Sequence, residues 1–441
     1  MKIAILGYGS QGKSAYNYWQ KGNDITICDS NPDIQLPSRA EYQLGPDYLE
    51  NLERYDLIIR SPSIHPREIV AANNDRITRK ITTVTEEFFR NCPAKIIGVT
   101  GTKGKGTTST LITKILETAG KTVHLGGNIG IPPLDMLKNE IKSTDIVVLE
   151  LANFQLIDLG VSPSIAVCLM VAPEHLDWHK DIDEYISAKQ NLFRYQKSED
   201  LAIYNRQNDL STVVAEVSTA LKMSYAVPPL DSEPADKNGA YVLGDWIYVD
   251  DEKICAVNGV ALLGRHNLEN VCAAIMATWK LIDYNPEIIK TAVKQFKGMP
   301  YRLELVRKVN GVKYYNDSFG TTPETAIVAI KAIKEPKILI VGGSDKKSNY
   351  SELAKTIKEN NVKQVIQIGK MGPILAEELQ KIGYTNLVAG GETMNDIVEM
   401  ASKHASAGDA VLLSTACASF DMFKNYKDRG DQFNTAVENL S

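Results

Sequence analysis

Several features of secreted, membrane-spanning and nucleic-acid-binding proteins are missing from this 441-residue sequence. The 6 cysteines are widely scattered and form no CxxC pair, which argues against a disulfide scaffold and for reduced, mostly buried thiols. No apolar run approaches the roughly 20 residues that a helix needs to cross a bilayer. The formal net charge of −5 leaves no basic excess for displacing counterions from nucleic acid.

We also expect no signal peptide, because the opening segment MKIAILG is short and runs directly into a glycine loop. A hydrophobic content of 44% and a charged content of 23% are ordinary for a globular protein. The sequence therefore indicates a soluble, cytoplasmic protein of two to four domains. We expect a monomer that acts on small molecules and has no nucleic-acid or membrane partner.

Short apolar strands alternate with helical segments in three successive blocks of the chain. Residues 1–93 contain the strands KIAILG, DITICD and YDLIIRS, a rhythm that indicates an open α/β sheet. Residues 94–298 begin with KIIGVTG and continue with near-continuous apolar strands such as DIVVLEL, followed by a polar hairpin, VLGDWIYVDDEKI. Residues 299–441 alternate again. The pattern predicts three α/β domains in series.

A glycine loop follows the first strand and contains Gly7, Gly9 and Gly12, and Asp29 closes the next strand. This pattern is typical of dinucleotide binding, in which the helix N-terminus holds a diphosphate and the carboxylate binds a ribose hydroxyl. Taken alone, it would indicate a nicotinamide-dependent dehydrogenase. The loop itself indicates only that some nucleotide diphosphate could bind there. Alternatively, the glycines form a structural turn that packs a helix onto a sheet.

A second glycine-rich loop, GTKGKGT at residues 101–107, is far more specific. It lies between a buried strand and a segment whose apolar residues follow helical spacing. Backbone N–H groups in such a loop converge on phosphate oxygens, and the helix N-terminus adds partial positive charge. Lys105 is placed to reach the β- and γ-phosphates, and the Thr107 hydroxyl is placed to ligate Mg²⁺. The loop predicts an ATP site.

Candidate metal ligands follow the next strands. Glu150 ends the apolar run IVVL, at the carboxyl edge where ligands collect in open α/β sheets. It would hold Mg²⁺ directly or through water. His175 and His179 have a spacing that would also fit zinc, but no third ligand of the usual type is evident. We favour His175 as a Mg²⁺ or substrate contact, with a structural histidine as the alternative.

In their order and spacing, these motifs resemble the Mur ligase superfamily over nearly the whole chain, and within it the ligases that add D-glutamate. The motifs that carry the resemblance are GTKGKGT at 101–107, GGNIG from Gly126, ELANFQL from Glu150, EHLD from Glu174, Ala188-Lys189, GRHNLEN from Gly264, MPYRLE from Met299, Asn316-Asp317-Ser318, and STACASFDMFKNYKDRG from Ser414.

The resemblance implies a three-domain α/β architecture. It gives a Rossmann-like domain for a uridine nucleotide over 1–93, and a central P-loop ATPase with a parallel sheet and a small β segment over 94–298. It gives a second Rossmann-like domain, for the incoming amino acid, over 299–441. The implied substrates are UDP-N-acetylmuramoyl-L-alanine, D-glutamate and ATP, with two Mg²⁺ ions.

Together, the loop and the resemblance assign roles to individual residues. The uridine nucleotide would contact Gly7, Ser10, Gln11, Asp29, Ser61 and Asn128. ATP would contact Gly101, Thr102, Lys103, Gly104, Lys105, Gly106, Thr107, Asn267, Asn270, Arg302 and Asp317. The metal ligands would be Thr107, Glu150, His175 and a carbamate on Lys189, and the catalytic residues Lys105, His175, Lys189 and Arg302. D-Glutamate would contact Thr321, Lys346, Ser419 and Tyr426.

The sequence departs from the family pattern at a few of these motifs. Phe319 stands where the family usually has a lysine, which removes a cation near the amino-acid and phosphoryl end. Tyr301 replaces a usual histidine, Ala152 and Asn153 replace a Ser-Ser pair, and Ser63 replaces a glycine.

The implied reaction has two steps. A substrate carboxylate attacks the γ-phosphorus of ATP to give an acyl-phosphate, and an amine then displaces phosphate from the acyl carbon. Closure of the third domain over the ATPase would exclude water.

Three alternatives remain open. A folylpolyglutamate-type ligase would not need the N-terminal glycine loop, and a Mur ligase for another amino acid would not share the stretch 414–430. A nicotinamide-dependent oxidoreductase or nucleotide sensor would leave the ATP loop unused.

Overall fold

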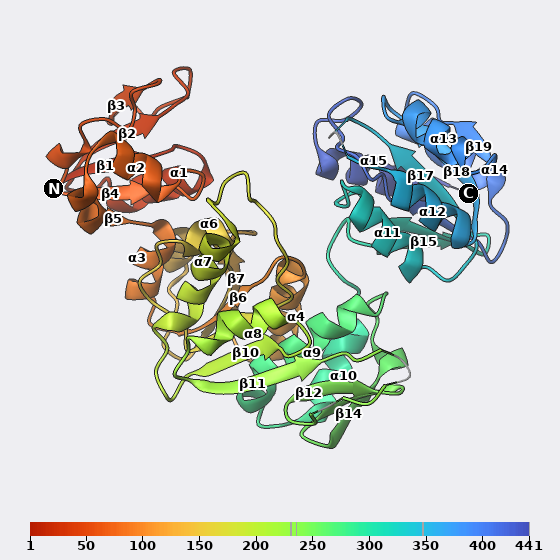
Figure 1. Cartoon of the computed structure of the whole chain (residues 1–441), viewed down its shortest axis with the longest axis horizontal. Helices are drawn as coiled ribbons and strands as arrows, with labels where there is room; N and C mark the ends of the chain where they lie inside the picture. Colours follow the sequence, from red (N-terminus) through yellow and green to blue (C-terminus); the bar gives the residue numbers. More distant parts are fainter. Residues whose placement is uncertain (230–231, 235, 346–347, 441) are drawn as a thin grey trace. The chain divides into compact units, whose positions relative to one another are not determined.

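The computed structural model describes residues 1–229, 232–234, 236–345 and 348–440. The chain divides into two compact units, one made of Met1–Gly259 with Leu268–Val293 and the other of Val260–Asn267 with Lys294–Ser441. Each unit consists of strands with helices packed against them (Figure 1). Three separate sheets confirm the expected succession of three α/β regions. The domain boundaries after residues 93 and 298 stay predictions.

The first sheet has the order β3-β2-β1-β4-β5, and all its strand pairs are parallel. Its strands are β1 (Lys2–Leu6), β2 (Asp24–Asp29), β3 (Glu41–Leu44), β4 (Leu57–Arg60) and β5 (Ile81–Thr82). The connecting helices are α1 (Ser10–Trp19), α2 (Pro66–Ala72) and α3 (Val84–Asn91), with the 3₁₀ helices η1 (Leu52–Arg54) and η2 (Asp75–Lys80).

The second sheet is the largest, with the order β14-β13-β12-β11-β10-β9-β6-β8-β7. Its parallel strands are β6 (Lys95–Thr100), β7 (Val123–Gly127), β8 (Ile146–Glu150), β9 (Ile165–Cys168), β10 (Leu201–Asn205) and β11 (Leu221–Ala226). The expected polar hairpin forms an antiparallel extension of β12 (Ala240–Leu243), β13 (Trp246–Val249) and β14 (Glu252–Ala256).

The helices of this region connect the strands of the sheet or follow its last strand. They are α4 (Lys105–Thr118), α5 (Pro133–Met136), α6 (Asn153–Leu156), α7 (Ile182–Arg194), α8 (Asp209–Glu216), α9 (His266–Thr278) and α10 (Pro286–Gln295), with η3 (Leu137–Asn139), η4 (Val257–Gly259) and η5 (Trp279–Ile282). Helix α3 of the first sheet packs against α5, and one hydrophobic cluster joins both regions. This shared core explains why the first two sheets belong to one compact unit.

The second unit is built on a six-stranded sheet with the order β15-β16-β20-β17-β18-β19. Its strands are β15 (Glu304–Val309), β16 (Val312–Asn316), β17 (Lys337–Gly342), β18 (Val362–Ile368), β19 (Leu387–Ala389) and β20 (Ala410–Leu413). Only β15 pairs antiparallel among these strands of the described chain. The helices are α11 (Pro323–Ala332), α12 (Ser351–Glu359), α13 (Gly372–Lys381), α14 (Met394–His404) and α15 (Tyr426–Glu438).

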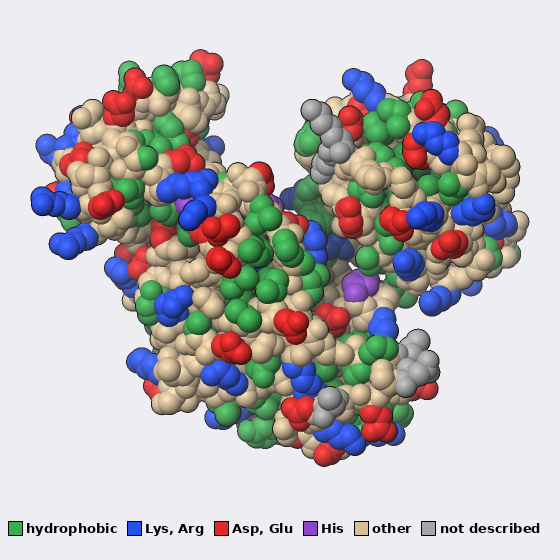
Figure 2. Space-filling model, in the orientation of Figure 1, with side chains coloured by type: hydrophobic (Ala, Val, Ile, Leu, Met, Phe, Trp, Pro, Cys, Tyr) green, Lys and Arg blue, Asp and Glu red, His purple; other side chains and the backbone are tan. Residues whose placement is uncertain are grey.

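The state of the cysteines and the distribution of surface charges agree with what the sequence composition indicates. All 6 cysteines are free thiols, and Cys92 alone is less than fully buried, as expected. Acidic and basic side chains are interspersed among the described residues on the face drawn in Figure 2. No helix within the described part of the chain combines the length and the apolar character needed to cross a membrane.

Candidate functional site

The six residues predicted to contact a uridine nucleotide line one cavity of about 520 Å³ in the first unit. They are Gly7, Ser10, Gln11, Asp29, Ser61 and Asn128. The cavity lies at the carboxyl ends of β1, β2 and β4, where the chain turns from each strand into the next segment. This is the edge at which parallel α/β sheets bind ligands.

The glycine loop after β1 is held tightly in place. Gly7 has a φ of +81°, which favours glycine, and its carbonyl oxygen accepts a 3.0 Å hydrogen bond from Ser61 Oγ. A Cβ on Gly12 would lie 2.0 Å from that same oxygen, so α1 approaches the loop only because residue 12 is glycine. The Asp29 carboxylate accepts the backbone N–H of Tyr8 at 2.7 Å. These contacts fix the loop and the carboxylate at the cavity wall.

Asn128 connects this cavity with the predicted metal carboxylate. It lines the cavity just beyond β7, and its side-chain amide donates a 2.8 Å hydrogen bond to Glu150 Oε1. Its backbone N–H donates to the Glu150 carbonyl oxygen at 2.8 Å. Glu150 ends β8, the strand between β7 and β6, and is 3% exposed. Glu150 therefore contacts a residue of the cavity wall and ends the strand that pairs with β6, which leads into the glycine loop 101–107.

The phosphate loop has the strand–loop–helix geometry that the sequence predicts. Gly101 has a φ of +144° and Gly104 a φ of +88°, both in the region that favours glycine. A Cβ on Gly104 would lie 2.3 Å from Asn270 Oδ1, and a Cβ on Gly101 would lie 2.7 Å from Leu169 Cβ. Helix α4 begins at Lys105 with Gly104 as its N-cap, so its first N–H groups face the loop.

Lys105 and Lys189 meet at the phosphate loop. Lys105 Nζ donates to the carbonyl oxygens of Gly101 and Thr102, each at 3.0 Å, and Lys189 Nζ lies 3.3 Å from the same Gly101 oxygen. Lys189 is 1% exposed and packs 4.4 Å over the Tyr185 ring. Burial, together with the charge of Lys105, lowers the pKa of Lys189 to about 7. The buried amine is therefore largely neutral at slightly alkaline pH.

His175 is partly exposed and packs against Phe154. Its side chain is 42% exposed, and its ring centroid is 4.8 Å from that of Phe154. Glu174 bridges the two segments, because it pairs with Lys103 of the loop at 2.5 Å and lies 3.7 Å from His175 Nε2. Thr102 secures the same segment through its hydroxyl, which donates to the Ala172 carbonyl oxygen at 2.9 Å.

The donors in this region suit Mg²⁺. Glu150 offers a buried carboxylate and Thr107 a buried hydroxyl. A carbamate on Lys189 would add an anionic oxygen ligand, and a neutral buried amine is the form that reacts with carbon dioxide. A set of hard oxygen donors with one imidazole fits Mg²⁺, whereas an ammonium at residue 189 would repel it.

Two predicted ATP contacts lie on α9. Asn270 is buried beside the loop, where its Oδ1 accepts a 3.1 Å hydrogen bond from Thr108 Oγ1. Asn267 Nδ2 donates to the Leu263 carbonyl oxygen at 2.7 Å. Asn270 belongs to the first compact unit and Asn267 to the second.

In the second unit, Asp317 follows β16 in a buried position. Its carboxylate accepts hydrogen bonds from Ser414 Oγ at 2.7 Å and from the Leu303 backbone N–H at 3.2 Å. Burial raises the pKa of Asp317 to about 7, although these donors and nearby Arg302 and Arg429 oppose the rise.

Phe319, the main departure from the family pattern, supports Arg302. The guanidinium carbon of Arg302 lies 3.8 Å from the Phe319 ring centroid, a cation–π contact. Tyr426 packs edge-on against Phe319 at 5.1 Å and against Tyr301 at 6.1 Å. Arg302 thus stacks on an aromatic ring at the position where the family has a lysine, and Tyr426 packs against that ring.

The predicted amino-acid contacts that the structure describes follow β16 or β20 in the chain. Thr321 precedes α11, Tyr426 begins α15, and Ser419 is 2% exposed in the segment after β20. Ser344, after β17, pairs with Ala418 through a 2.8 Å backbone hydrogen bond, which brings these two segments together. Lys346 lies outside the described residues.

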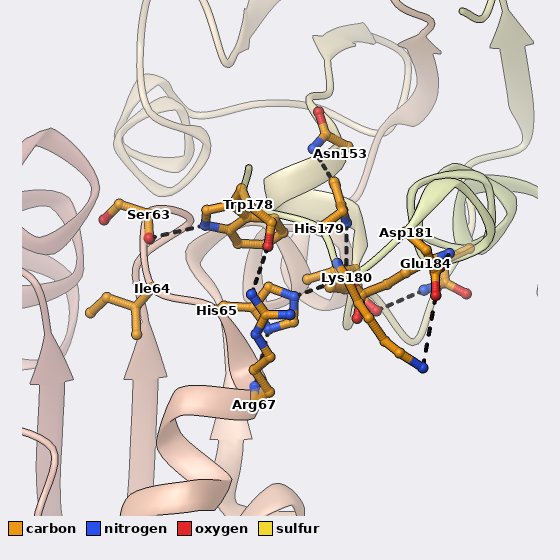
Figure 3. A network of polar contacts seen from close by, with 12 residues as sticks. Ser63, Ile64, His65, Arg67, Asn153, Trp178, His179, Lys180, Asp181 and Glu184 are labelled. Atoms are coloured by element: carbon orange, nitrogen blue, oxygen red, sulfur yellow. Dashed lines mark hydrogen bonds and ion pairs between the residues drawn. The ribbon is translucent and has the colours of Figure 1, made fainter. Parts of the chain in front are cut away.

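The sequence did not predict a polar network around Glu184 (Figure 3). Glu184 Oε2 lies 3.1 Å from His65 Nε2 and 3.2 Å from His179 Nδ1, and His179 Nε2 lies 2.6 Å from Asn153 Nδ2. Burial lowers the pKa of His179. His179 thus joins His65 and Glu184, and His175 lies outside this group of potential ligands. His65 and Glu184 are 119 residues apart, so local spacing gives no signal for the contact.

Models of known families match two regions of the chain. The Mur ligase middle domain matches residues 99–278, which include the phosphate loop, Glu150 and Lys189. The Mur ligase glutamate ligase domain matches residues 301–417, which include Arg302 and Asp317.

Whole proteins match as well. The UDP-N-acetylmuramoylalanine–D-glutamate ligases of Acetivibrio thermocellus and Clostridium tetani are 37% and 34% identical, cover 100% of this chain, and are themselves covered over 96% and 97% of their length. Among solved structures, the UDP-N-acetylmuramate-alanine ligase MurC of Thermotoga maritima aligns with a TM-score of 0.61 at 16% identity over 99% of both chains. The MurF ligase of the same organism, in complex with ADP, aligns with a TM-score of 0.60 at 17% identity over 100% of this chain and 95% of that one. These structures share the fold, and the full-length sequence relatives show that the chain belongs to the Mur ligase family.

Proposed function

We propose that this chain is an ATP-dependent ligase that joins UDP-N-acetylmuramoyl-L-alanine and D-glutamate in cytoplasmic peptidoglycan precursor synthesis. The observation that carries the proposal is the Asn128–Glu150 hydrogen bond of 2.8 Å, which joins the nucleotide cavity to the end of the phosphate-loop sheet. A substrate bound in that cavity would extend its acyl end toward the transferred phosphoryl group. The relatives at 37% and 34% identity carry this activity in their names.

In the proposed first step, an oxygen of the alanyl carboxylate attacks the γ-phosphorus of ATP, the bond to the β-phosphate oxygen breaks, and ADP leaves. The loop residues 101–107 hold the phosphates through backbone N–H groups. Lys105 turns from its two carbonyl partners toward the transferred phosphoryl group, and Arg302, Asn267, Asn270 and Asp317 contact the rest of ATP. Positioning and neutralisation of charge supply most of the rate in such transfers.

Mg²⁺, in two ions, fits this site through Thr107, Glu150, His175 and a carbamate on Lys189. When bound, it would neutralise the charge that gathers as the carboxylate approaches ATP. The buried Tyr185 and the Gly101 carbonyl oxygen hold the Lys189 side chain in place for that role.

In the second step, the D-glutamate amine attacks the acyl carbon, loses a proton, and displaces phosphate from the tetrahedral intermediate. Thr321 and Lys346 would hold one carboxylate of D-glutamate, and Ser419 with backbone near Tyr426 would hold the other. Each charge-assisted hydrogen bond of this kind contributes about 1.5–3 kcal/mol, so an uncharged amino acid would leave these donors unpaired.

The test is phosphate release measured with each reactant omitted in turn. We expect release only when ATP, Mg²⁺, UDP-N-acetylmuramoyl-L-alanine and D-glutamate are all present, with one phosphate per amide formed. Phosphate release at the same rate with and without the uridine substrate would contradict the proposal. If NADH fluorescence rises on mixing with the protein, and if NAD but not UDP reverses the rise by displacing NADH, the result would favour a nicotinamide-binding protein instead.

A further inference from the structure

The segment 61–67 of the first unit lines the cavity with some of its residues and contacts the central region with others. Ser61, Ser63 and Ile64 line the nucleotide cavity, and the residues that follow them contact the central region. Arg67 Nη2 donates to the Trp178 carbonyl oxygen at 3.0 Å, and Trp178 Nε1 donates back to the Ser63 carbonyl oxygen at 3.3 Å (Figure 3). The cavity wall is thus bonded to the segment 174–179, which carries the proposed metal ligand His175.

His65 is the N-cap of α2, and its hydrogen bonds define its tautomer. Its Nδ1 accepts the Arg67 backbone N–H at 3.1 Å, which requires a lone pair on that nitrogen. A neutral imidazole then carries its proton on Nε2, which lies 3.1 Å from Glu184 Oε2. His65 therefore donates to Glu184.

His179 is arranged in the same way on the other side of Glu184. The Asn153 amide donates to His179 Nε2 at 2.6 Å, so the His179 proton lies on Nδ1, 3.2 Å from Glu184 Oε2. The Lys180 backbone N–H donates to the same oxygen at 2.8 Å. One carboxylate oxygen thus accepts from two histidines and a backbone amide.

These hydrogen bonds argue against a metal ion in the group formed by His65, His179 and Glu184. A cation would need lone pairs on His65 Nε2 and His179 Nδ1, but both nitrogens carry the protons donated to Glu184. Binding it would break the N-cap of α2 and the Asn153 contact. The group therefore works as a hydrogen-bonded anchor centred on a carboxylate.

Both arms of this anchor lead to functional segments. Through His65 it reaches the cavity wall. Through His179 it reaches His175, whose carbonyl oxygen accepts the His179 backbone N–H at 3.0 Å, and Asn153, which begins α6 shortly after Glu150. In Figure 3 the Asn153 amide nitrogen faces His179 and its oxygen points away.

We infer that Glu184 is a positioning residue that couples the nucleotide cavity to the phosphate site, by tying the segment 61–67 to the segment 174–179. A ligand in the cavity restricts the motion of the segment 61–67. Because Glu184 is hydrogen-bonded to both segments, the motion of the residues around His175 and Asn153 is then restricted as well. The inference rests on the proposed function, because it takes a uridine nucleotide and ATP as the two ligands.

The test measures the coupling between two ligands in the intact chain. Calorimetry gives the Kd of a non-hydrolysable ATP analogue with Mg²⁺, without and with saturating UDP. UDP lacks the acyl carboxylate that would meet the γ-phosphate, so any coupling it produces must pass through the protein. By linkage, the same factor must appear when the order of addition is reversed.

Two variants and one control probe the anchor. His65→Asn keeps an N-cap oxygen for α2 but is too short to reach Glu184, and Glu184→Gln removes the charge at unchanged size. His124→Asn is the control, because His124 bonds Asp145 at 3.0 Å in the same unit but outside the network. We expect UDP to tighten analogue binding by about 5-fold or more in the unaltered protein and the control. In His65→Asn and Glu184→Gln we expect coupling below about 2-fold, with each single-ligand Kd changed by less than about 3-fold.

Coupling that persists in both variants, or that is absent from the unaltered protein, would overturn the inference. One equivalent of Zn²⁺ bound by the unaltered protein and lost in His179→Ala would also overturn it, in favour of a metal site. Failure of the unaltered protein to bind UDP at all would instead contradict the proposed function, so the two failures are distinguishable.

Discussion

Lys105 reaches back over the phosphate loop to the carbonyl oxygens of Gly101 and Thr102. Its ammonium therefore rests on the loop's own carbonyl oxygens, and we expect it to turn toward the transferred phosphoryl group when ATP binds. We predict that Lys105→Ala lowers kcat by about 100-fold or more, because a cation that stabilises the transferred phosphoryl group is lost. UDP affinity should not change. Lys121→Ala, an exposed lysine just after α4, is the control. Near-normal turnover in Lys105→Ala would contradict the phosphate-loop assignment.

The burial of Lys189 makes the stability of the folded chain depend on pH. Its pKa is about 7 in the folded protein, against an ordinary value of 10.5. Below pH 7 the amine is charged in both states, and the penalty for burying it is complete. As the pH rises from about 7 toward 10.5, the unfolded state binds more protons than the folded state, so the stability of the unaltered protein rises.

We therefore predict that Lys189→Met is more stable than the unaltered protein by a margin that is largest near pH 6 to 7 and shrinks as the pH approaches about 10. Urea unfolding at several pH values, in buffers free of bicarbonate, measures this difference. A margin that stays constant with pH would show that Lys189 is protonated in the folded protein over the whole range.

Phe319 replaces the lost lysine with a surface for Arg302. We predict that Phe319→Leu lowers kcat/KM for ATP by roughly 2- to 30-fold, the range of a cation–π contact of about 0.5–2 kcal/mol. Phe319→Tyr keeps the ring and should stay near the unaltered value. Steady-state kinetics with varied ATP decides the matter. Equal values for the leucine and tyrosine variants would mean that the 3.8 Å stacking contact does not position Arg302.

At the scale of elements, the phosphate loop combines backbone strain with close contact. Gly104 has a φ of +88° and a Cβ there would lie 2.3 Å from Asn270 Oδ1, whereas Gly120 has a φ of +75° with open space around it. We predict that Gly120→Ala loses about 1–2 kcal/mol of unfolding free energy from the left-handed backbone, and that Gly104→Ala loses more because its Cβ also meets Asn270. Gly104→Ala should also weaken binding of an ATP analogue, while Gly120→Ala should not. Equal analogue affinity in the two variants would contradict the role of the Gly104 contact.

The elements that local sequence determines could be predicted. The strand KIIGVTG, the glycine loop and the helix after it form β6 and α4 as expected, because their glycine spacing and apolar period are short-range signals. The polar segment VLGDWIYVDDEKI forms the end of β12, all of β13 and the start of β14, since alternating apolar residues and polar turns specify antiparallel pairing. The resemblance predicted that Gly7, Asp29, Ser61 and Asn128 contact one ligand. They line one cavity in the structure, although they lie on separate connections.

Contacts between distant segments could not be predicted. The ion pair of Arg60 with Asp158, at 2.5 Å, joins residues that are 98 positions apart, and the Glu184 network depends on His65, which is 119 positions away. In the sequence Phe319 indicates only a lost charge, because the sequence alone does not reveal that Arg302 packs on its ring. Such pairs follow from strand order and helix packing, which set the distances only after the chain has folded.

At the scale of the whole molecule, the proposed ATP contacts come from both compact units. Lys105 and Asn270 belong to the first, and Arg302, Asp317 and Asn267 to the second. If these proposed contacts are right, the reaction would draw residues from both units, and the second unit would select the amino acid. Its matched family model is the glutamate ligase domain, over residues 301–417.

The most direct test of the account is kcat/KM for D-glutamate, L-glutamate, L-alanine and glycine at fixed, saturating UDP-N-acetylmuramoyl-L-alanine and ATP. We predict a preference for D-glutamate of at least about 100-fold over the uncharged amino acids, because a site with donors for two carboxylates leaves them unpaired otherwise. L-Glutamate should also be disfavoured, since its carboxylates and amine do not reach the same three points together. A clear preference for L-alanine, glycine or L-glutamate would contradict the proposed function.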